Sequence, residues 1–569
     1  MSEAEQKRSG STEDIVVAAS DLALIDRYRD EPAPLLPILH AFHNRDGYLG
    51  AAAIEAIGKA LRIPLADLYG TVTFYHHFAR EEGGLQRPRV CTGPICCQRG
   101  ALEVLNGLEG AEEMPCAGRC DDPVPVLIGE DTFVVSAPFQ TLQRRTSSPL
   151  PVPNPGGLEE CVFGAIREPG RATLAGYRRS GGYGALTRAL QEMTPTEVID
   201  VLKASKLAGR GGAGFPTGMK WQFVREAAGG PKSVVCNADE GEPGCFKDRA
   251  LMDHDPLALI EGMTLAGYAM GAPRGFLYLR YEYPETYKRL EQAMAEAETA
   301  GLLGESILGT DFSFRIYLRR GAGAYICGEE TSLLNSLEGK HPFPRNRPPY
   351  PTTHGFENLP TAVNNVETLC AAPQILRRGA DWYESLGLGE HAGTKVISLS
   401  GDVQRPGNYE VPFGLALRTL LYEWAGGPLP GRKFQAATMA GLSGGFLGRE
   451  AIESVTLDEP SIRGAGSMLG AGGIMIFDDS RDIVEMARQA MAFFAHESCG
   501  KCFPCRIGTQ RLLERLSGGG PERLEAWQQE VRDIGEVLEL SACGLGVAAG
   551  FVSESLLNNF PQQVAAFRP

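Results

Sequence analysis

The sequence predicts a multidomain protein of the α/β class. Its 569 residues are enough for about three to five domains. Helical periodicity dominates both ends of the chain, whereas apolar runs typical of buried strands, such as 233–237 and 275–280, lie in the middle. A segment rich in proline, serine and glycine at 146–157 separates the first part from the rest. These observations favour several linked units over one fold.

Composition and periodicity divide the chain into seven segments. They are, in order, a polar tail expected to be disordered (1–20), a helical segment (21–82), a small mixed unit (83–145), a linker (146–160), a large α/β domain (161–393), a unit of short strands around one helix (394–480) and a mostly helical C-terminal unit (481–569). No solenoid repeat is visible in the sequence.

Composition excludes several classes of function. The formal net charge of −15 argues against nucleic acid as a partner. No apolar run is long enough to span a bilayer, so we expect no direct membrane insertion. The first fourteen residues are polar and show no secretory signal, which predicts a cytoplasmic protein. In that compartment fourteen cysteines are expected to be metal ligands rather than disulfides.

Four cysteines near the C-terminus predict a [4Fe-4S] cluster. Cys499, Cys502 and Cys505 follow one another at a C-x2-C-x2-C spacing, and Cys543 lies further along the chain. Three thiolates on one turn and one remote thiolate are typical of a chain that holds a cubane cluster. A tetrahedral zinc site is the alternative, but such sites usually pair two separate C-x2-C units. The spacing therefore favours the cluster.

A second set of cysteines predicts a [2Fe-2S] cluster in the N-terminal part. Cys91 and Cys96 form a C-x4-C pair, and Cys116 and Cys120 form a C-x3-C pair. Two pairs of thiolates suit a rhombic cluster in which each pair holds one iron. A zinc site and a redox disulfide are the alternatives. Cys97 adjoins Cys96, so the sequence leaves open which of the two is the ligand.

A glycine-rich stretch and several polar clusters lie in the large α/β segment. The stretch 209–221 brings backbone N–H groups toward a helix start, which suits a phosphate, although a structural turn explains it equally well. The acidic run 237–244 follows a strand, and sheets of this class bind ligands at that position. The clusters 325–330 and 363–368 add further polar groups, with loop or cap residues as the alternative.

These motifs together resemble a known family. Residues 160–569 resemble the NADH-binding flavoprotein subunit of respiratory complex I, because the motifs at 209–221, 237–244, 325–330, 364–365 and 497–505 occur in the same order. Residues 21–145 resemble the neighbouring thioredoxin-like [2Fe-2S] subunit, including Gly70–Tyr75 and both cysteine pairs. One departure is the gap between Cys96 and Cys116, which is shorter than in complex I and puts the surroundings of that cluster in doubt.

The resemblance implies a fold and a set of cofactor ligands. The fold is an N-terminal helical and thioredoxin-like [2Fe-2S] unit, a Rossmann-like FMN and NADH domain, a ubiquitin-like β-grasp domain and a helical bundle with the [4Fe-4S] cluster. The residues implied for FMN are Gly209, Gly211, Gly212, Gly214, Lys220, Asn237, Asp239, Tyr325, Gly328, Glu329, Asn364, Asn365 and Thr368. Those implied for NADH are Phe215, Phe223 and Tyr350 as stacking partners, with Glu240, Glu242 and Glu330 on the ribose and nicotinamide side.

The fusion of both subunits in one chain resembles the diaphorase subunits of soluble NAD-dependent oxidoreductases. This implies an enzyme that passes electrons between NAD(H), FMN and the clusters, with no catalytic side chain because the hydride transfer takes place at FMN. We expect the β subunit of an NAD-dependent formate dehydrogenase, with a catalytic α subunit that carries further iron–sulfur clusters and molybdenum or tungsten. The alternatives are an NAD-reducing hydrogenase, complex I, and, from a different class, a zinc-bearing scaffold without redox activity.

Overall fold

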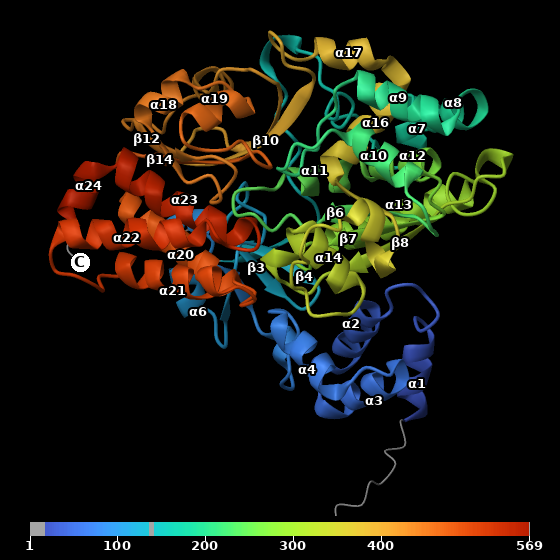
Figure 1. Cartoon of the computed structure of the whole chain (residues 1–569), viewed down its shortest axis with the longest axis horizontal. Coiled ribbons are helices and arrows are strands. Elements are labelled where there is room, and N and C mark those ends of the chain that lie inside the picture. The colour runs from blue at the N-terminus through green and yellow to red at the C-terminus, as the bar shows by residue number, and fades with distance from the viewer. Residues whose placement is uncertain (1–17, 136–140, 568–569) are drawn as a thin grey trace, which may run out of the picture.

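The computed structural model of the chain describes residues 18–135 and 141–567. It contains two five-stranded sheets and one four-stranded sheet, with helices around them, so the predicted α/β class is confirmed. Figure 1 shows the N-terminal helices at the bottom of the molecule and the C-terminal bundle at its left. Residues 1–17 of the expected disordered tail lie outside the described part, and the first helix starts at Ala19.

The four-stranded sheet of the central domain is parallel and covered on both faces. Its strand order is β8-β7-β6-β9. Val234 and Cys236 face one apolar cluster, whereas Val235 between them faces another. This alternation is the period of two that a strand imposes on its side chains. The strands are β6 (Ser233–Ala238), β7 (Arg274–Leu279), β8 (Arg315–Arg320) and β9 (Thr361–Asn365).

The first face of this sheet is covered by helices of the central domain. Helices α12 and α16 pack against each other and against β6. The helices of this domain are α7 (Leu174–Arg179), α8 (Gly184–Glu192), α9 (Pro195–Ala204), α10 (Thr217–Glu226), α11 (Lys247–His254), α12 (Pro256–Met270), α13 (Pro284–Thr299), α14 (Glu330–Leu337), α15 (Pro351–His354), α16 (Val366–Arg378) and α17 (Ala380–Ser385).

The N-terminal helices share in the cover of the second face. Their buried residues Leu39, Ile57 and Val72 belong to the same apolar cluster as Val235 and Phe276 of the sheet. The N-terminal helices therefore share a core with the central domain, although the linker and the small mixed unit separate the two in sequence. The helices are α1 (Ala19–Asp26), α2 (Leu35–Asp46), α3 (Ala51–Leu61) and α4 (Leu65–Phe74).

The thioredoxin-like unit is a small mixed sheet with two short helices. Its strand order is β2-β1-β3-β4-β5, and only β1 and β2 pair in parallel. The elements are β1 (Arg89–Cys91), α5 (Pro94–Gln98), α6 (Ala101–Gly107), β2 (Glu112–Met114), β3 (Pro125–Ile128), β4 (Asp131–Val135) and β5 (Leu142–Arg145). In Figure 1, β3 and β4 of this sheet are seen between the C-terminal bundle and α14 of the central domain.

The β-grasp unit and the C-terminal bundle complete the molecule. The β-grasp sheet has the order β11-β10-β14-β12-β13 and packs on the helical turn η6 (Thr419–Trp424). Its other elements are β10 (Thr394–Gly401), β11 (Gly407–Pro412), β12 (Phe434–Thr438), β13 (Phe446–Gly448), α18 (Arg449–Ser454), α19 (Glu459–Gly464) and β14 (Gly473–Asp478). The bundle contains α20 (Ile483–Glu497), α21 (Phe503–Leu516), α22 (Leu524–Leu538), α23 (Gly544–Asn559) and α24 (Pro561–Ala566).

In the part of the chain that the structure describes, no helix is both long enough and apolar enough to cross a membrane.

Candidate flavin and iron–sulfur sites

The polar motifs of the central domain meet at the carboxyl ends of its parallel strands. Asn237 at the end of β6 is register-paired with Asn365 at the end of β9. The glycine-rich stretch precedes α10, and Lys220 of that helix donates to the carbonyl oxygen of Val363 at 2.9 Å. Parallel α/β sheets bind their ligands at this edge. The structure therefore brings the predicted flavin residues together.

The glycine-rich stretch has a backbone shape that requires glycine. Gly212 and Gly214 have φ angles of +121° and +65°, where a side chain would be strained. A Cβ atom on Gly211 would come within 3.1 Å of the Cβ of Asn365. The backbone N–H of Arg210 donates to Thr368 Oγ1 at 2.8 Å. This stretch therefore lies directly against β9 and the start of α16, with its backbone open to a ligand.

Polar atoms at this edge fit a flavin. Asp239 Oδ2 is buried and has no hydrogen-bond partner among the described residues, and burial raises the pKa of this carboxyl well above its usual range. Asn237 donates to the carbonyl oxygen of Gly328 at 2.8 Å. A Cβ on Gly214 would meet no described atom within 4 Å, so there is space beside the stretch. A polar group of a ligand beside Asp239 would give its unpaired oxygen a partner. Glu329, by contrast, is occupied in capping α14 through Thr331 and Ser332.

Glu242 connects the central domain to the β-grasp unit. Its carboxylate accepts hydrogen bonds from Tyr325 Oη at 2.5 Å, from Ser443 N at 3.0 Å and from Ser443 Oγ at 2.6 Å. Burial raises the pKa of Glu242 to about 7, although these donors act against the shift. The carboxylate therefore titrates near neutral pH at the border of two domains.

Glu240 has contacts that the sequence did not indicate. Its carboxylate accepts from the backbone N–H groups of Asp248 at 2.9 Å and Arg249 at 3.2 Å, and from Tyr283 Oη at 3.0 Å. The residue is 7% exposed, and burial raises its pKa to about 7. The structure thus directs Glu240 toward the first turn of α11 and the [2Fe-2S] unit, whereas Glu242 lies beside Tyr325.

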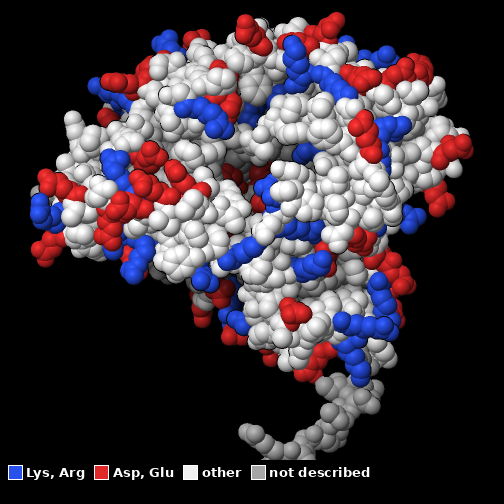
Figure 2. All heavy atoms as spheres, in the orientation of Figure 1, with Lys and Arg blue, Asp and Glu red and all other residues white. Residues whose placement is uncertain are grey.

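Three aromatic side chains predicted to stack on NADH are exposed. Phe215, Phe223 and Tyr350 have exposed fractions of 44%, 43% and 57%, and the rings of Phe215 and Phe223 lie 6.3 Å apart. Single exposed apolar side chains are common, but a group of exposed aromatic rings can mark a binding site. Glu330 lies near them, because it pairs with Lys220 at 3.9 Å. Figure 2 shows a recess at the centre of one face, with acidic side chains inside it.

The C-terminal cysteines converge between three helices. Cys499 follows the end of α20, Cys502 directly precedes α21, Cys505 lies in the first turn of α21 and Cys543 directly precedes α23. Burial, together with the nearby thiols of Cys499 and Cys502, raises the pKa of Cys543 to about 11. The fold therefore joins the remote cysteine to the three closely spaced ones, as a four-thiolate cage requires.

The N-terminal cysteines also form a compact group. Cys116 and Cys120 have their sulfur atoms 3.6 Å apart, and the backbone N–H of Ala117 donates to Cys91 Sγ at 3.4 Å. Cys96 contacts the Cys91 thiol and raises its pKa, together with Cys116. Cys97, however, donates its thiol to the carbonyl oxygen of Thr92 at 3.2 Å. The geometry thus groups Cys96, and not Cys97, with the other three.

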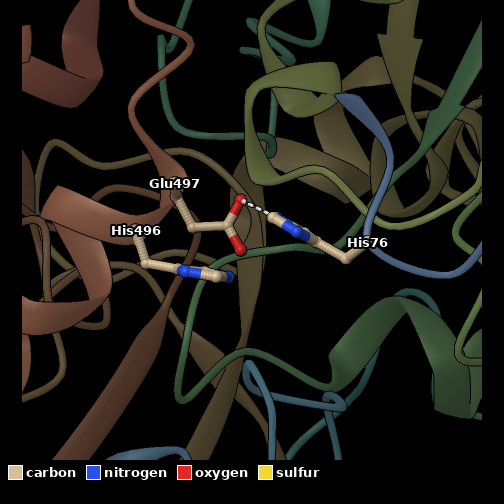
Figure 3. Close-up of side chains that lie close together, drawn as sticks. All are labelled: His76, His496 and Glu497. Atoms are coloured by element: carbon tan, nitrogen blue, oxygen red, sulfur yellow. Dashed lines mark hydrogen bonds and ion pairs between the residues drawn. The ribbon is translucent and has the colours of Figure 1, made fainter. Parts of the chain in front are cut away.

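Sequence reasoning missed a group of side chains between the two cysteine sets. Figure 3 shows His76, His496 and Glu497 close together, with the His76 ring 3.4 Å from the Glu497 carboxylate. The two histidine rings are stacked, with their centroids 4.5 Å apart and their planes 21° from parallel. Glu497 also accepts from the backbone N–H of Tyr325 at 2.9 Å. This group fastens the cubane segment to the flavin side.

Charged residues that directly follow strand β7 were also missed. Arg280 and Glu282 line a cavity together with Cys116, Asp239, Tyr325 and Glu497. The signal in the sequence is the change from the apolar run 275–279 to charged residues at the strand's carboxyl end, the position where such sheets bind ligands.

Four family models match the chain in the predicted order. They are a thioredoxin-like [2Fe-2S] ferredoxin over residues 22–114, the Nuo51 FMN-binding domain over 202–374, the SLBB domain over 396–446 and the NADH-ubiquinone oxidoreductase-F iron-sulfur binding region over 485–567. The chain therefore carries the domains for FMN, NADH, a [2Fe-2S] cluster and a [4Fe-4S] cluster, and this confirms the predicted cofactors.

Similar proteins match over most of their length. An F-type NADH-quinone oxidoreductase subunit of Rhizobium meliloti is 47% identical over 412 residues, which cover 72% of this chain and 97% of the relative. The NAD-reducing hydrogenase HoxS subunit alpha of Cupriavidus necator is 34% identical over 576 residues, 95% of this chain and 92% of the relative.

A solved structure shares the fold along nearly the whole chain. A chain of the NAD+-reducing [NiFe]-hydrogenase in its H2-reduced state superposes with a TM-score of 0.78 at 33% identity, and the match covers 94% of each chain. Both the fused arrangement and the order of domains agree. This chain belongs to the family of NADH-binding flavin and iron–sulfur electron-transfer subunits that includes the F-type subunits of NADH-quinone oxidoreductases and the alpha subunit of NAD-reducing hydrogenase HoxS.

Proposed function

We propose that the chain is the diaphorase subunit of a complex of the NAD-reducing hydrogenase type. It takes a hydride, and so two electrons, from NADH and passes them one at a time to a partner subunit, or it returns two electrons and a proton to NAD+. FMN, when bound, supplies the conversion between two-electron and one-electron transfer. The observation that carries this proposal is the meeting of the glycine-rich stretch with the ends of β6 and β9, in one chain with two cysteine quartets.

The side chains of this chain bind and orient the cofactors. The glycine-rich stretch with Lys220 would hold the flavin phosphate, and Asp239 with the asparagines at the ends of β6 and β9 would bind the polar edge of the ring. Phe215, Phe223 and Tyr350 would stack on the adenine of NADH. Glu242 and Glu330 would line the ribose and nicotinamide side.

The choice of partner follows from the match over the full chain. The hydrogenase subunit and the hydrogenase structure each match at least 92% of their own length. These findings support the hydrogenase alternative better than the formate dehydrogenase that we expected from the sequence. The partner would carry the further iron–sulfur clusters and the nickel site.

All fourteen cysteines lie in the described part and none forms a disulfide, which fits the reducing cytoplasm.

The decisive experiment is anaerobic purification of the tagged chain with its native partner. We expect released FMN, about six iron atoms per copy of this chain in addition to the partner's iron, and NAD+ reduction driven by hydrogen. Purification of the chain alone separates its iron from that of the partner. Molybdenum or tungsten in the complex, with formate-driven NAD+ reduction, would replace the hydrogenase by formate dehydrogenase. Stoichiometric zinc in place of iron would contradict the diaphorase function itself.

The cysteine geometry predicts which residue of the Cys96–Cys97 pair holds the [2Fe-2S] cluster. Cys97→Ser should leave the iron content near about six atoms per chain, because the Cys97 thiol points to Thr92 O. Cys96→Ser should remove about two iron atoms and the signal of the reduced [2Fe-2S] cluster. Iron analysis and electron paramagnetic resonance on the isolated chain measure both. Loss of the cluster in the Cys97 variant alone would reverse the assignment.

The position of Glu242 predicts a preference for NADH that depends on pH. An ionised Glu242 should repel the 2′-phosphate of NADPH, which costs several kcal/mol, or about 100-fold in kcat/KM. Because the pKa of Glu242 is raised to about 7, the carboxyl is mostly neutral at pH 6 and ionised at pH 8, so the preference should grow over that range.

Steady-state reduction of a dye by the two nucleotides at pH 6, 7 and 8 measures this preference. Glu242→Gln is the matched variant, since it keeps the size of the side chain and removes its titration. It also corrects for titration of the 2′-phosphate, whose pKa is about 6. The same pH profile in both proteins would exclude Glu242 as the source of the preference.

A further inference from the structure

The loop between Cys116 and Cys120 is held by a side chain of the FMN domain. Arg280, at the carboxyl end of β7, is only 4% exposed and donates from Nη2 to the carbonyl oxygen of Cys116 at 2.6 Å. It also donates from Nη1 to the carbonyl oxygen of Glu240, and from Nε to Glu282 at 3.0 Å. One guanidinium thus joins the [2Fe-2S] loop to the acidic loop that follows β6.

A second arginine fixes the same loop. Arg249 donates to the carbonyl oxygen of Gly118 at 2.8 Å and pairs with Asp121 through two contacts of 2.7 and 2.8 Å. Gly118 has a φ of +63°, and a Cβ there would come within 2.1 Å of Tyr283 Oη, so only glycine fits. The two arginines bind the carbonyl oxygens of the loop, whereas Ala117 N–H faces Cys91 Sγ.

This arrangement places the full positive charges of two guanidinium groups, and the partial positive charge of a backbone N–H, beside the proposed [2Fe-2S] ligands. The carbonyl oxygens of Cys116 and Gly118 are turned toward the guanidinium groups, and the backbone N–H of Ala117 is turned toward sulfur. The charge of Arg249 is offset by two contacts with one carboxylate. Arg280 makes a single contact with Glu282, which is itself shared with His77 at 3.1 Å. The field of Arg280 is therefore less completely cancelled.

We propose that Arg280 is a positioning residue that raises the reduction potential of the [2Fe-2S] cluster held by Cys91, Cys96, Cys116 and Cys120. Reduction adds one electron, and hence one negative charge, to the cluster. A buried cation and the Ala117 N–H oriented toward sulfur stabilise the reduced form more than the oxidised form. The cluster thereby becomes a better electron acceptor. This inference rests on the proposed ligands of the cluster.

The test is a redox titration of the isolated chain followed by electron paramagnetic resonance. In Arg280→Gln the ratio of reduced to oxidised [2Fe-2S] at the wild-type midpoint should fall at least tenfold, which is a shift of about 59 mV for one electron. Glu282→Gln should shift the ratio in the opposite direction, because it removes the anion that offsets Arg280 and keeps an oxygen for hydrogen bonding.

Two controls separate this effect from general damage. Arg320 ends the neighbouring strand β8 and is 7% exposed, but it donates to Tyr281 O and Glu130, so Arg320→Gln should not shift the potential. The [4Fe-4S] signal of each variant serves as an internal reference and should stay in place. A change below threefold in Arg280→Gln, or an equal shift of both clusters, would overturn the inference.

The test still gives an answer if the Arg280→Gln variant fails to assemble its [2Fe-2S] cluster. If Arg280→Gln loses the cluster, the direction of the shift in Glu282→Gln decides: an upward shift supports the inference, and no shift or a downward shift overturns it. A wild-type chain that lacks any [2Fe-2S] signal would instead contradict the proposed function. The two failures are therefore distinguishable.

Discussion

Replacing Cys502 with alanine should stop electron delivery from this chain to its partner and leave NADH binding and flavin reduction nearly intact. Cys502 lies at the start of α21, where it meets Cys499, Cys505 and Cys543, and a cubane cage needs all four thiolates. Even changes outside a ligand set cost 10- to 100-fold in metal sites, so we expect a loss of at least about 100-fold in turnover of the complex. The proposed flavin residues belong to other elements.

Stopped-flow bleaching of the flavin measures its reduction by NADH. Turnover of the intact complex measures electron delivery to the partner. Cys97→Ser is the matched control, since it removes a half-buried thiol that donates to Thr92 O and lies in a different domain from the C-terminal cysteines. The bundle loses a cross-link between α21 and α23 when the cluster is lost, so thermal unfolding must be recorded for each variant. A folded Cys502→Ala protein with normal turnover would place this cluster off the main route.

Replacing Glu410 with alanine should loosen the contact between the β-grasp unit and segment 161–163 of the central domain. Glu410 on β11 is 1% exposed, and its carboxylate accepts from the backbone N–H groups of Cys161, Val162 and Phe163 at 2.6 to 3.1 Å. Thr394 donates its hydroxyl to the same group. Without the carboxylate, three buried donors lose their partner, at a cost of about 1–3 kcal/mol each. We therefore expect a loss of about 3 kcal/mol in the local free energy of opening.

Hydrogen exchange of the three backbone amides is the direct measurement for this second variant. A loss of about 3 kcal/mol corresponds to exchange that is more than about 100-fold faster at Cys161, Val162 and Phe163. Glu453→Ala is the control in the same unit, because Glu453 is 39% exposed and pairs with Arg418 on the surface. Its effect should stay below about 1 kcal/mol. Unchanged protection at 161–163 in Glu410→Ala would show that this carboxylate is not the anchor.

The effect should extend to the flavin site. The glycine-rich stretch packs against the β-grasp unit, since a Cβ on Gly212 would lie 3.6 Å from the backbone N of Ala471. Loosening the β-grasp unit would therefore loosen one wall beside that stretch. Retention of FMN after gel filtration, compared between Glu410→Ala and Glu453→Ala, follows this consequence.

The sequence was sufficient for features that depend on local spacing. The cysteines at 499, 502 and 505 are close in space because they are close in the chain, so their spacing alone predicts a cage. The apolar runs 233–237 and 275–280 correspond to β6 and β7, because a strand covered on both faces is continuously apolar. The polar residues that follow such runs mark the ligand edge of the sheet. The cofactors and the α/β class therefore followed from the sequence and the resemblance that it carries.

Tertiary structure decided which surfaces meet and how each charged side chain is used. The bond from Arg280 to Cys116 spans 164 residues, and the one from His76 to Glu497 spans 421 residues, so no spacing in the sequence indicates either. The thiol of Cys97 donates to the carbonyl oxygen of Thr92, and the first turn of α11 takes the carboxylate of Glu240. The N-terminal helices cover a face of the central sheet, although a linker separates the two in the sequence. Each of these outcomes depends on long-range packing, because a buried charge or apolar face takes whichever partner the assembled fold brings to it.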